Sequence, residues 1–493
     1  MSLTLAIDQS TSATKAVLFD ASGNAVAKAS REHRQIYPLP GHVEHDAEEI
    51  WQNLLAVVRE LAEKHGDLIN KVARFSLTNQ RETILIFDRR TGQPLHHALV
   101  WQDRRGDAIC QQLRDAGHED AVRAKTGLKI DGYFSASKLK WLIDARPGLA
   151  EKIRTGEAVI GTIDAYLIHR LTSGQTFATD HSNASRTLLY DIGRLRWDEE
   201  LCVLFDVSPN ALPQVRESSA VFGETDCGGT LPKSVPIVGV MGDSQAALFT
   251  QRCFTPGTAK ATFGTGTSVM LNVGDRMPAD DGGGAVAALA WVLDGKPTYA
   301  LEGIINYSAA TIAWLKDGLR LIKDADEVEA LASAVPDSGG VYFVPAFAGL
   351  GAPHWSPDAR AAVIGMSSHT RREHVVRAAL ESIAFQVRDV VDMLRADAGV
   401  RLATLNADGG ATRNAMLMQF IADLTGAELV VSDVPEASAL GATFAGMIGD
   451  GTLAGVDAVA ALRRQSKTYR PAMPRPDADR LHAGWLAAVK RVL

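Results

Sequence analysis

The sequence predicts an α/β protein built from two similar domains that face each other across a cleft. Predicted strands alternate with amphipathic helices. One pattern, an apolar strand, a turn rich in Gly, Ser and Thr, and a second strand, occurs twice, at residues 3–19 and 259–273. A weak internal duplication of this kind is typical of two structurally related units. The boundary is expected near residues 251–257, which gives domains at 1–252 and 253–493.

The composition limits the class of protein. A chain of 493 residues is too long for one hydrophobic core. Charged residues make up 22% and hydrophobic residues 46%, a balance that excludes long disorder. The net charge of -7 and the lack of basic runs interleaved with aromatic residues argue against a nucleic-acid surface. The longest apolar run, residues 285–293, is too short to span a bilayer and no signal pattern precedes the first strand, so we expect a cytoplasmic protein without membrane insertion.

The first predicted strand, residues 3–7, ends in Asp8 and a hydroxyl-rich turn that contains Thr11 and Ser12. The hydroxyls and amides of this turn, together with Lys15, can grip phosphate oxygens, while Asp8 can hold a hydrated magnesium ion. The spacing of a Walker A loop is missing here and in the rest of the chain. An ordinary polar turn is the alternative interpretation.

A second group of polar residues follows the strand predicted at residues 74–78. Arg81 and Glu82 are adjacent there, and a guanidinium that donates beside a carboxylate that accepts is complementary to an alcohol. Trp101 and Tyr133 each flank a predicted element farther along the chain. Aromatic rings among charged groups commonly line a polyol pocket, although each ring alone is more typical of the core.

In the middle of the chain, an apolar strand at residues 235–241 breaks at Gly242 and delivers Asp243 to the start of a helix. In open α/β sheets, ligands bind outside the carboxyl ends of strands, where a helix N-terminus favours an anion or a polarised oxygen. The strand at 259–263 then enters a turn at 264–267 whose exposed amides suit phosphate oxygens. A helix-capping Asp followed by a simple hairpin is the alternative.

A third turn follows the strand predicted at residues 402–407. It reads Asp-Gly-Gly-Ala and opens a helix that contains Asn414. Such a turn can accept the phosphate or ribose of a nucleotide at the helix N-terminus.

The chain resembles the FGGY carbohydrate kinases along essentially its whole length, and among them most the members that phosphorylate glycerol. The stretches that carry this resemblance include LTNQRET (77–83), ALVWQDRR (98–105), SNASRTLLYD (182–191), GVYFVPAFAGLGAPHW (340–355) and ADGGATRNAMLMQF (407–420). The two FGGY signatures are nearly complete, at 133–144 and 361–381. The resemblance implies two duplicated, actin-like (ribonuclease-H-like) ATPase domains flanking a cleft. It also implies phosphorylation of a terminal hydroxyl of a small polyol with ATP and Mg²⁺, by a dimer or tetramer.

The resemblance assigns roles to individual residues. Its polyol-binding positions match Arg81, Glu82, Trp101, Tyr133 and Asp243, with Asp243 as the catalytic base. Its ATP-binding positions match Thr11, Ser12, Thr265, Gly410 and Asn414, and Lys15 stands where the family usually has Arg. Asp8 matches the acidic residue near the magnesium ion.

Two departures fall in the implied substrate pocket. Members that phosphorylate glycerol typically have Gln where this chain has Ser244, and Phe where it has Ser268. The changes remove a hydroxyl-binding amide and an apolar wall, so we expect a wider and wetter pocket. Glycerol stays the first expectation, and a larger polyol or sugar (erythritol, threitol, a pentitol or a ketopentose) stays open, because pockets discriminate poorly against one missing methylene. A non-enzymatic, actin-like nucleotide sensor is the third possibility.

Overall fold

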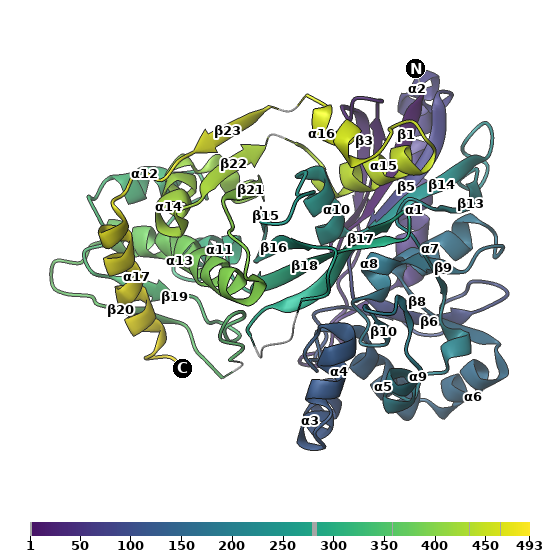
Figure 1. Ribbon diagram of the computed structural model, residues 1–493, viewed down its shortest axis with the longest axis horizontal. Helices are drawn as coiled ribbons and strands as arrows, with labels where there is room; N and C mark the ends of the chain where they lie inside the picture. The colour runs from purple at the N-terminus through teal and green to yellow at the C-terminus, as the bar shows by residue number, and fades with distance from the viewer. Residues whose placement is uncertain (1, 279–282, 357, 433, 464) are drawn as a thin grey trace.

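The computed structural model describes residues 2–278, 283–356, 358–432, 434–463 and 465–493. Two mixed sheets organise the chain (Figure 1). The first has the order β13-β14-β5-β1-β2-β3 and the second β17-β18-β16-β15-β21-β22-β23. The strands of the first sheet are β1 (Leu3–Gln9), β2 (Ala13–Phe19), β3 (Ala25–Glu32), β5 (Val72–Asn79), β13 (Val221–Thr225) and β14 (Val235–Gly242). Those of the second are β15 (Thr258–Phe263), β16 (Thr267–Gly274), β17 (Val286–Leu293), β18 (Lys296–Ile305), β21 (Thr404–Gly409), β22 (Glu428–Ser432) and β23 (Ser466–Tyr469).

The two sheets repeat one topology. In the first, β1 pairs antiparallel with β2 and parallel with β5, and β14 lies parallel to β5. In the second, β15 pairs antiparallel with β16 and parallel with β21, and β22 lies parallel to β21. The order β14-β5-β1-β2-β3 therefore recurs as β22-β21-β15-β16-β18. The predicted duplication of an α/β unit is confirmed.

Helices cover the sheets of both lobes. The first lobe contains α1 (Ala47–Lys64), α2 (Gly66–Ile69), α3 (Asp107–Asp115), α4 (Glu119–Thr126), α5 (Ser135–Ala145), α6 (Pro147–Thr155), α7 (Ile163–Leu171), α8 (His181–Ala184) and α9 (Glu199–Leu204). It also has a four-stranded sheet of β4 (Glu44–His45), β7 (Ala98–Leu99), β6 (Ile84–Asp88) and β8 (Ala158–Thr162). Asp46 caps α1, since its carboxylate accepts from the backbone N–H of Glu48 and Glu49.

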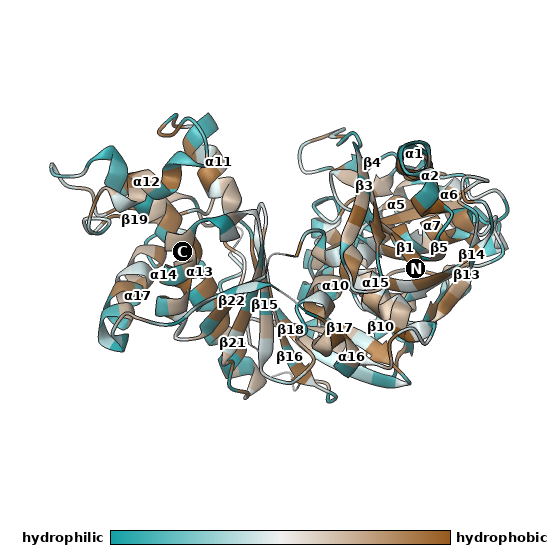
Figure 2. Cartoon of the chain, turned by 90° about the horizontal axis from the view of Figure 1, so that it is seen from above, coloured by the Kyte–Doolittle hydropathy of each residue, from teal (hydrophilic) through white to brown (hydrophobic). Residues whose placement is uncertain are grey.

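The later helices are α10 (Asp243–Thr250), α11 (Ala309–Asp317), α12 (Glu327–Ser333), α13 (Arg372–Ala398), α14 (Ala415–Thr425), α15 (Ala437–Gly449), α16 (Val456–Ala461) and α17 (Arg475–Val489). A short ribbon of β19 (Tyr342–Val344) and β20 (Ala362–Ile364) accompanies them. Apolar residues concentrate on the strands inside each lobe, and hydrophilic ones on the outlying loops (Figure 2). Within the described residues, no helix has the length and apolarity that crossing a membrane requires.

Helices α10 and α15 lie where the two lobes meet. Although α15 belongs to the second half of the sequence, it packs against α10 and against β14, β5 and β1 of the first sheet (Figure 1). An apolar cluster shared by both lobes surrounds the pair and includes Phe249 of α10, Trp291 of β17 and Phe444 of α15. The helices approach so closely that a Cβ at Gly441 would collide with the backbone carbonyl of Ala246. This contact holds α10 against α15, which itself packs on the first sheet.

Candidate active site

Two neighbouring strand ends of the first sheet carry the central residues of the site. Strands β5 and β14 run parallel and end in register, Asn79 opposite Gly242. Arg81 therefore follows one strand end and Asp243 the other, and Arg81 Nε lies 3.3 Å from Asp243 Oδ1. Glu82 has φ +60, a left-handed conformation that costs a non-glycine backbone energy.

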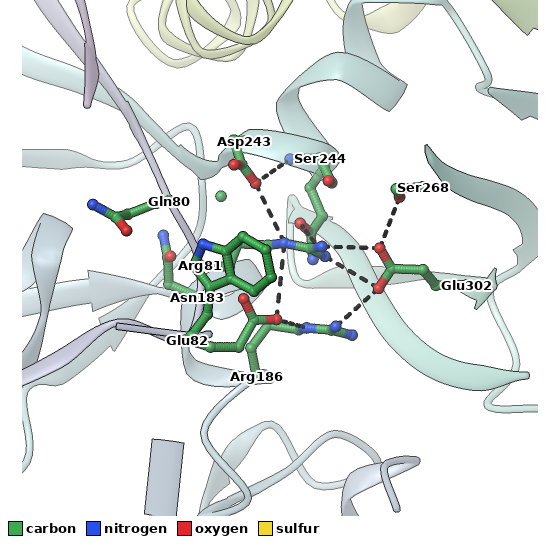
Figure 3. Close-up of polar contacts among 12 residues, drawn as sticks. Gln80, Arg81, Glu82, Asn183, Arg186, Asp243, Ser244, Ser268 and Glu302 are labelled. Atoms are coloured by element: carbon green, nitrogen blue, oxygen red, sulfur yellow. Dashed lines mark hydrogen bonds and ion pairs between the residues drawn. The ribbon is translucent and has the colours of Figure 1, made fainter. Parts of the chain in front are cut away.

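A buried charge network joins these residues to the second lobe. Glu302 of β18 accepts from Arg81 Nη2 at 2.9 Å and from Arg81 Nη1 at 3.3 Å. Arg186, which follows α8, lies 2.9 Å from Glu302 and donates through Nε to Glu82 at 2.6 Å. Ser268 Oγ on β16 donates to Glu302 Oε1 at 2.8 Å. Figure 3 shows both arginines pointing at Glu302, with Asp243 on another side of Arg81.

Asp243 is the least enclosed carboxylate of this group. Its side chain keeps 36% of its surface exposed, whereas Glu82 and Glu302 keep 2% and 0%. Partial burial raises the pKa of Asp243 above that of an ordinary Asp, and the charge of Arg81 opposes the shift. Oδ1 accepts the backbone N–H of Ser244 at 2.7 Å. Among the described residues no hydrogen bond reaches Oδ2, so this oxygen is available to accept a proton.

The two predicted aromatic residues form one wall. The rings of Trp101 and Tyr133 are 5.5 Å apart. Trp101 Nε1 donates to Thr11 Oγ1 at 3.0 Å, which ties this wall to the turn between β1 and β2. The ammonium of the buried Lys138 donates to the carbonyl oxygens of Gly132 and Tyr133, both at 2.7 Å, and so fixes the loop that carries the second ring.

The turn between β1 and β2 carries the residues predicted to bind phosphate on the first lobe. Ser12 is exposed, and Lys15 points to two carboxylates: Glu436 at 2.8 Å and Asp8 at 3.6 Å. Burial raises the pKa of Asp8 to about 6, although Lys15 opposes the shift. Lys15 is therefore already paired with Glu436, which immediately precedes α15 of the second half.

The equivalent turn of the second lobe lies between β15 and β16. Gly264 N–H donates to Gly266 O at 2.9 Å, and a Cβ at Gly266 would collide with the carbonyl of Ile305, so the turn is tight. Thr265 is exposed at its tip. Because Phe263 pairs with Gly409, the exposed Gly410 lies at the same edge of the sheet.

Asn414, predicted to contact the nucleotide, caps α14 beyond that edge. Its Oδ1 accepts the backbone N–H of Leu417 at 2.8 Å, which leaves its amide N–H₂ to donate. A side chain at Gly410 would point into open space, so the backbone at this edge is accessible to a ligand.

The residues present suit a magnesium ion that accompanies a nucleotide. The described part of the chain holds no group of three or more His, Cys, Asp and Glu side chains that could bind a metal by themselves. Mg²⁺ in kinases is held by one or two carboxylates and otherwise by phosphate oxygens and water, a requirement that Asp8 meets.

Glu302 and Arg186 are central to the network and were missed by the sequence reasoning. Arg186 lies inside one of the stretches that carry the family resemblance. Glu302 is the single acid in the buried stretch Ala300–Ile305, which is otherwise apolar or glycine. An isolated carboxylate in a buried strand needs a cationic partner, and that signal could have identified it.

Comparison with known proteins agrees with this geometry. Residues 3–250 match the N-terminal domain of the FGGY family of carbohydrate kinases, and residues 259–449 match its C-terminal domain. The glycerol kinase of Leptothrix cholodnii is 48% identical, with 100% of each chain covered. That of Carboxydothermus hydrogenoformans is 46% identical, with 99% of this chain and 97% of the relative covered.

A solved structure extends the likeness to the fold. The crystal structure of Plasmodium falciparum glycerol kinase with ADP has a TM-score of 0.94 at 37% identity and covers 100% of this chain and 98% of its own. The xylulose kinase of Lactobacillus acidophilus, at 21% identity and a TM-score of 0.87, covers 100% of this chain and 98% of its own and shares the fold. The chain belongs to the FGGY family of carbohydrate kinases.

Proposed function

We propose that the protein transfers the γ-phosphoryl group of ATP to a terminal hydroxyl of glycerol, giving glycerol 3-phosphate. The observation that carries this proposal is the Asp243 carboxylate, half-exposed beside the Arg81 guanidinium with Oδ2 free. Phosphoryl transfer depends on alignment and charge neutralisation, and a positioned base takes the proton of the attacking hydroxyl. Glycerol kinases at 46% and 48% identity over nearly the whole chain support glycerol as the acceptor.

The polyol would bind between the two strand ends and the aromatic wall. The Nη groups of Arg81 already donate to Glu302 and Gln245 and its Nε edge faces Asp243, which leaves one Nη2–H for a substrate hydroxyl. Glu82 would accept from a hydroxyl, and the rings of Trp101 and Tyr133 would cover the C–H faces of the substrate.

The nucleotide would bind across the two turns. Its contacts would come from Thr11, Ser12 and Lys15 on the first lobe and from Thr265, Gly410 and Asn414 on the second, with Asp8 holding the hydrated Mg²⁺. When bound, Mg²⁺ neutralises charge on the phosphate oxygens. As part of the same proposal, the enzyme works in the cytoplasm as a homo-oligomer, a dimer or tetramer, on a small-molecule substrate.

A larger polyol or sugar is the second candidate, and Ser244 and Ser268 favour it. Both side chains are small and only partly buried. Ser268 Oγ donates to Glu302, so this hydroxyl makes a polar edge on the second lobe where a bulkier apolar side chain would close the site. An additional hydroxymethyl group of the substrate could be solvated there.

A substrate panel tests the proposal. Glycerol, erythritol, threitol, xylitol and ketopentoses are each offered with ATP and Mg²⁺, and kcat/KM is measured from ADP formation. We expect glycerol to give the highest value, with the longer polyols lower by about 10- to 200-fold, the range of one methylene in a pocket. A tetritol or pentose that exceeds glycerol would establish the second candidate. If no polyol accelerates ADP formation, the kinase proposal fails.

A further inference from the structure

We propose that Glu302 is a positioning residue for the transfer reaction: it holds the Arg81 fork away from Asp243 and so keeps the Asp243 carboxylate available as a proton acceptor. The proposal rests on the proposed function, because it concerns the base of that reaction. Glu302 itself touches no atom that would react.

The contacts of Glu302 show that it acts on other residues and that it is closed off from a ligand. Its side chain is fully buried, and its two oxygens contact Arg81 Nη1 and Nη2, Arg186 Nη2 and Ser268 Oγ at 2.8–3.3 Å. Three of these contacts are hydrogen bonds, and the contact with Arg186 is an ion pair, so two cations and a hydroxyl surround the carboxylate. Nearby Arg charge lowers the pKa of Glu302, so the carboxylate is ionised throughout the working range of pH.

The orientation of Arg81 follows from these contacts. A guanidinium prefers to meet a carboxylate with two parallel N–H donors. Here Glu302 accepts from both Nη groups, so only the Nε edge of Arg81 faces Asp243. Nε lies 3.3 Å from Asp243 Oδ1. Without the Glu302 charge, the carboxylates that remain paired with Arg81 would be Asp243 and Glu82, at 3.3 and 3.9 Å from its Nε. A two-point pair between Arg81 and Asp243 would occupy the free Oδ2.

Electrostatics acts in the same direction. The charged groups around Asp243 are Arg81 and Asp8 from the first sheet, Lys260 of β15 and Glu302 of β18. Glu302 raises the pKa of Asp243, and Arg81 and Lys260 lower it. Removing the charge of Glu302 therefore lowers the pKa of Asp243 and weakens it as a base.

The position of Glu302 also couples this effect to the arrangement of the lobes. Arg81 and Arg186 belong to the first lobe, whereas Glu302 and Ser268 lie on β18 and β16 of the second. Asp243 therefore stays unpaired with the Nη groups of Arg81 only while the second sheet keeps Glu302 of β18 against the first lobe.

The variant Glu302→Gln tests the proposal because it keeps the size of the side chain and removes its charge. We expect kcat to fall on the order of 10- to 100-fold, the loss typical of a misplaced group at an active site. The acid limb of the kcat–pH profile should move to lower pH. The matched control is Glu381→Gln, which removes another buried carboxylate from an Arg pair, Arg377 at 2.7 Å within α13. The control should leave the acid limb in place.

Two further measurements keep the test decisive. If Glu302→Gln does not fold, Glu302→Asp retains the charge but is too short to reach both arginines, and it should lower kcat at least fivefold. A ¹³C NMR titration of the Asp243 carboxyl, identified by comparison with Asp243→Asn, reads its pKa without turnover. An unchanged Asp243 titration in the Glu302 variant, or a change in KM alone, would overturn the proposal. Absent polyol-dependent turnover in the wild type would instead refute the proposed function.

Discussion

The two lobes share one backbone path but place different chemistry on it. In the first lobe, the cross-strand pair one step before the turn is Asp8 opposite Lys15; in the second, it is Thr262 opposite Ser268. The sheet position occupied by Glu302 on β18 belongs to Lys28 on β3. Lys28 on the edge strand β3 is largely exposed, whereas Glu302 is buried against Arg81 and Arg186 of the first lobe. The comparison teaches that the duplication repeats the backbone positions of the sheet. The burial of each position then decides which role a charged side chain can have there.

The acids at the start of two equivalent helices differ in the same way. Asp243 begins α10 after β14, and Glu436 precedes α15 after β22. Lys15 holds Glu436 at 2.8 Å and leaves 13% of its side chain exposed, whereas Asp243 is 36% exposed and has one free oxygen. Asp243 is therefore suited to accept a proton, and Glu436 is suited to act as the counterion of Lys15. The predictions below test this division.

The largest effect is expected from Asp243→Asn. The amide cannot accept a proton, so kcat should fall by roughly 10²–10⁴-fold, the usual contribution of a general base. The wild type should also lose activity as pH falls through the raised pKa of Asp243, because only the ionised carboxylate accepts a proton. That acid limb should be missing from the residual activity of the variant. Polyol affinity, measured by calorimetry, should stay within a few-fold; near-normal turnover would remove Asp243 from the role.

The next effect concerns the contact that aligns the lobes. A Cβ at Gly441 would meet the backbone of α10, which cannot shift as a flexible side chain does, so Gly441→Ala should lower the free energy of unfolding by about 1–3 kcal/mol. The control is Gly148→Ala in α6, where a Cβ meets open space; helix propensity should raise stability there by about 0.5–1 kcal/mol. Urea titration measures both. A Gly441→Ala variant as stable as the wild type would show that α10 and α15 can move apart without a loss in the free energy of unfolding.

Much of the fold was readable from local sequence. Each strand and helix that was predicted is present within a few residues of its expected bounds, because apolar periodicity and caps such as Asp46 are local signals. The placement of α15 was not readable. Its sequence, Ala437–Gly449, is apolar on most sides and rich in small residues, so no stripe indicates which sheet it covers. Only the assembled structure shows α15 against the first sheet.

The same limit applies to the site. Arg81 and Asp243 follow strand ends, and the carboxyl edge of a sheet is a general location for ligands, so the sequence could indicate them. Glu302 lies 221 positions from Arg81 and has no motif of its own. The family resemblance identified residues expected to contact ligands. It did not identify the residues that position those side chains. Long-range pairs between lobes therefore had to come from the structure.

A smaller effect is expected from Glu436→Gln. Lys15 would lose its closest counterion, at 2.8 Å, and the turn would become more positive. Because Lys15 is partly exposed, solvent screens the pair and its loss is worth about 0.5–1 kcal/mol, so the KM for ATP should fall roughly two- to fivefold. Initial rates at saturating polyol measure it. A rise in the KM for ATP would mean that Glu436 positions Lys15 and does not compete with phosphate.

The smallest effect is expected from Lys28→Met, which completes the comparison. Lys28 lies 3.6 Å from Glu436 with 67% of its side chain exposed, and such surface pairs contribute about 0–1 kcal/mol. Its loss should leave kcat and both KM values within about twofold of the wild type, although Glu302 at the equivalent sheet position controls turnover. A kcat loss for Lys28→Met as large as that for Glu302→Gln would mean that the sheet position itself, and not burial beside Arg81, determines the effect.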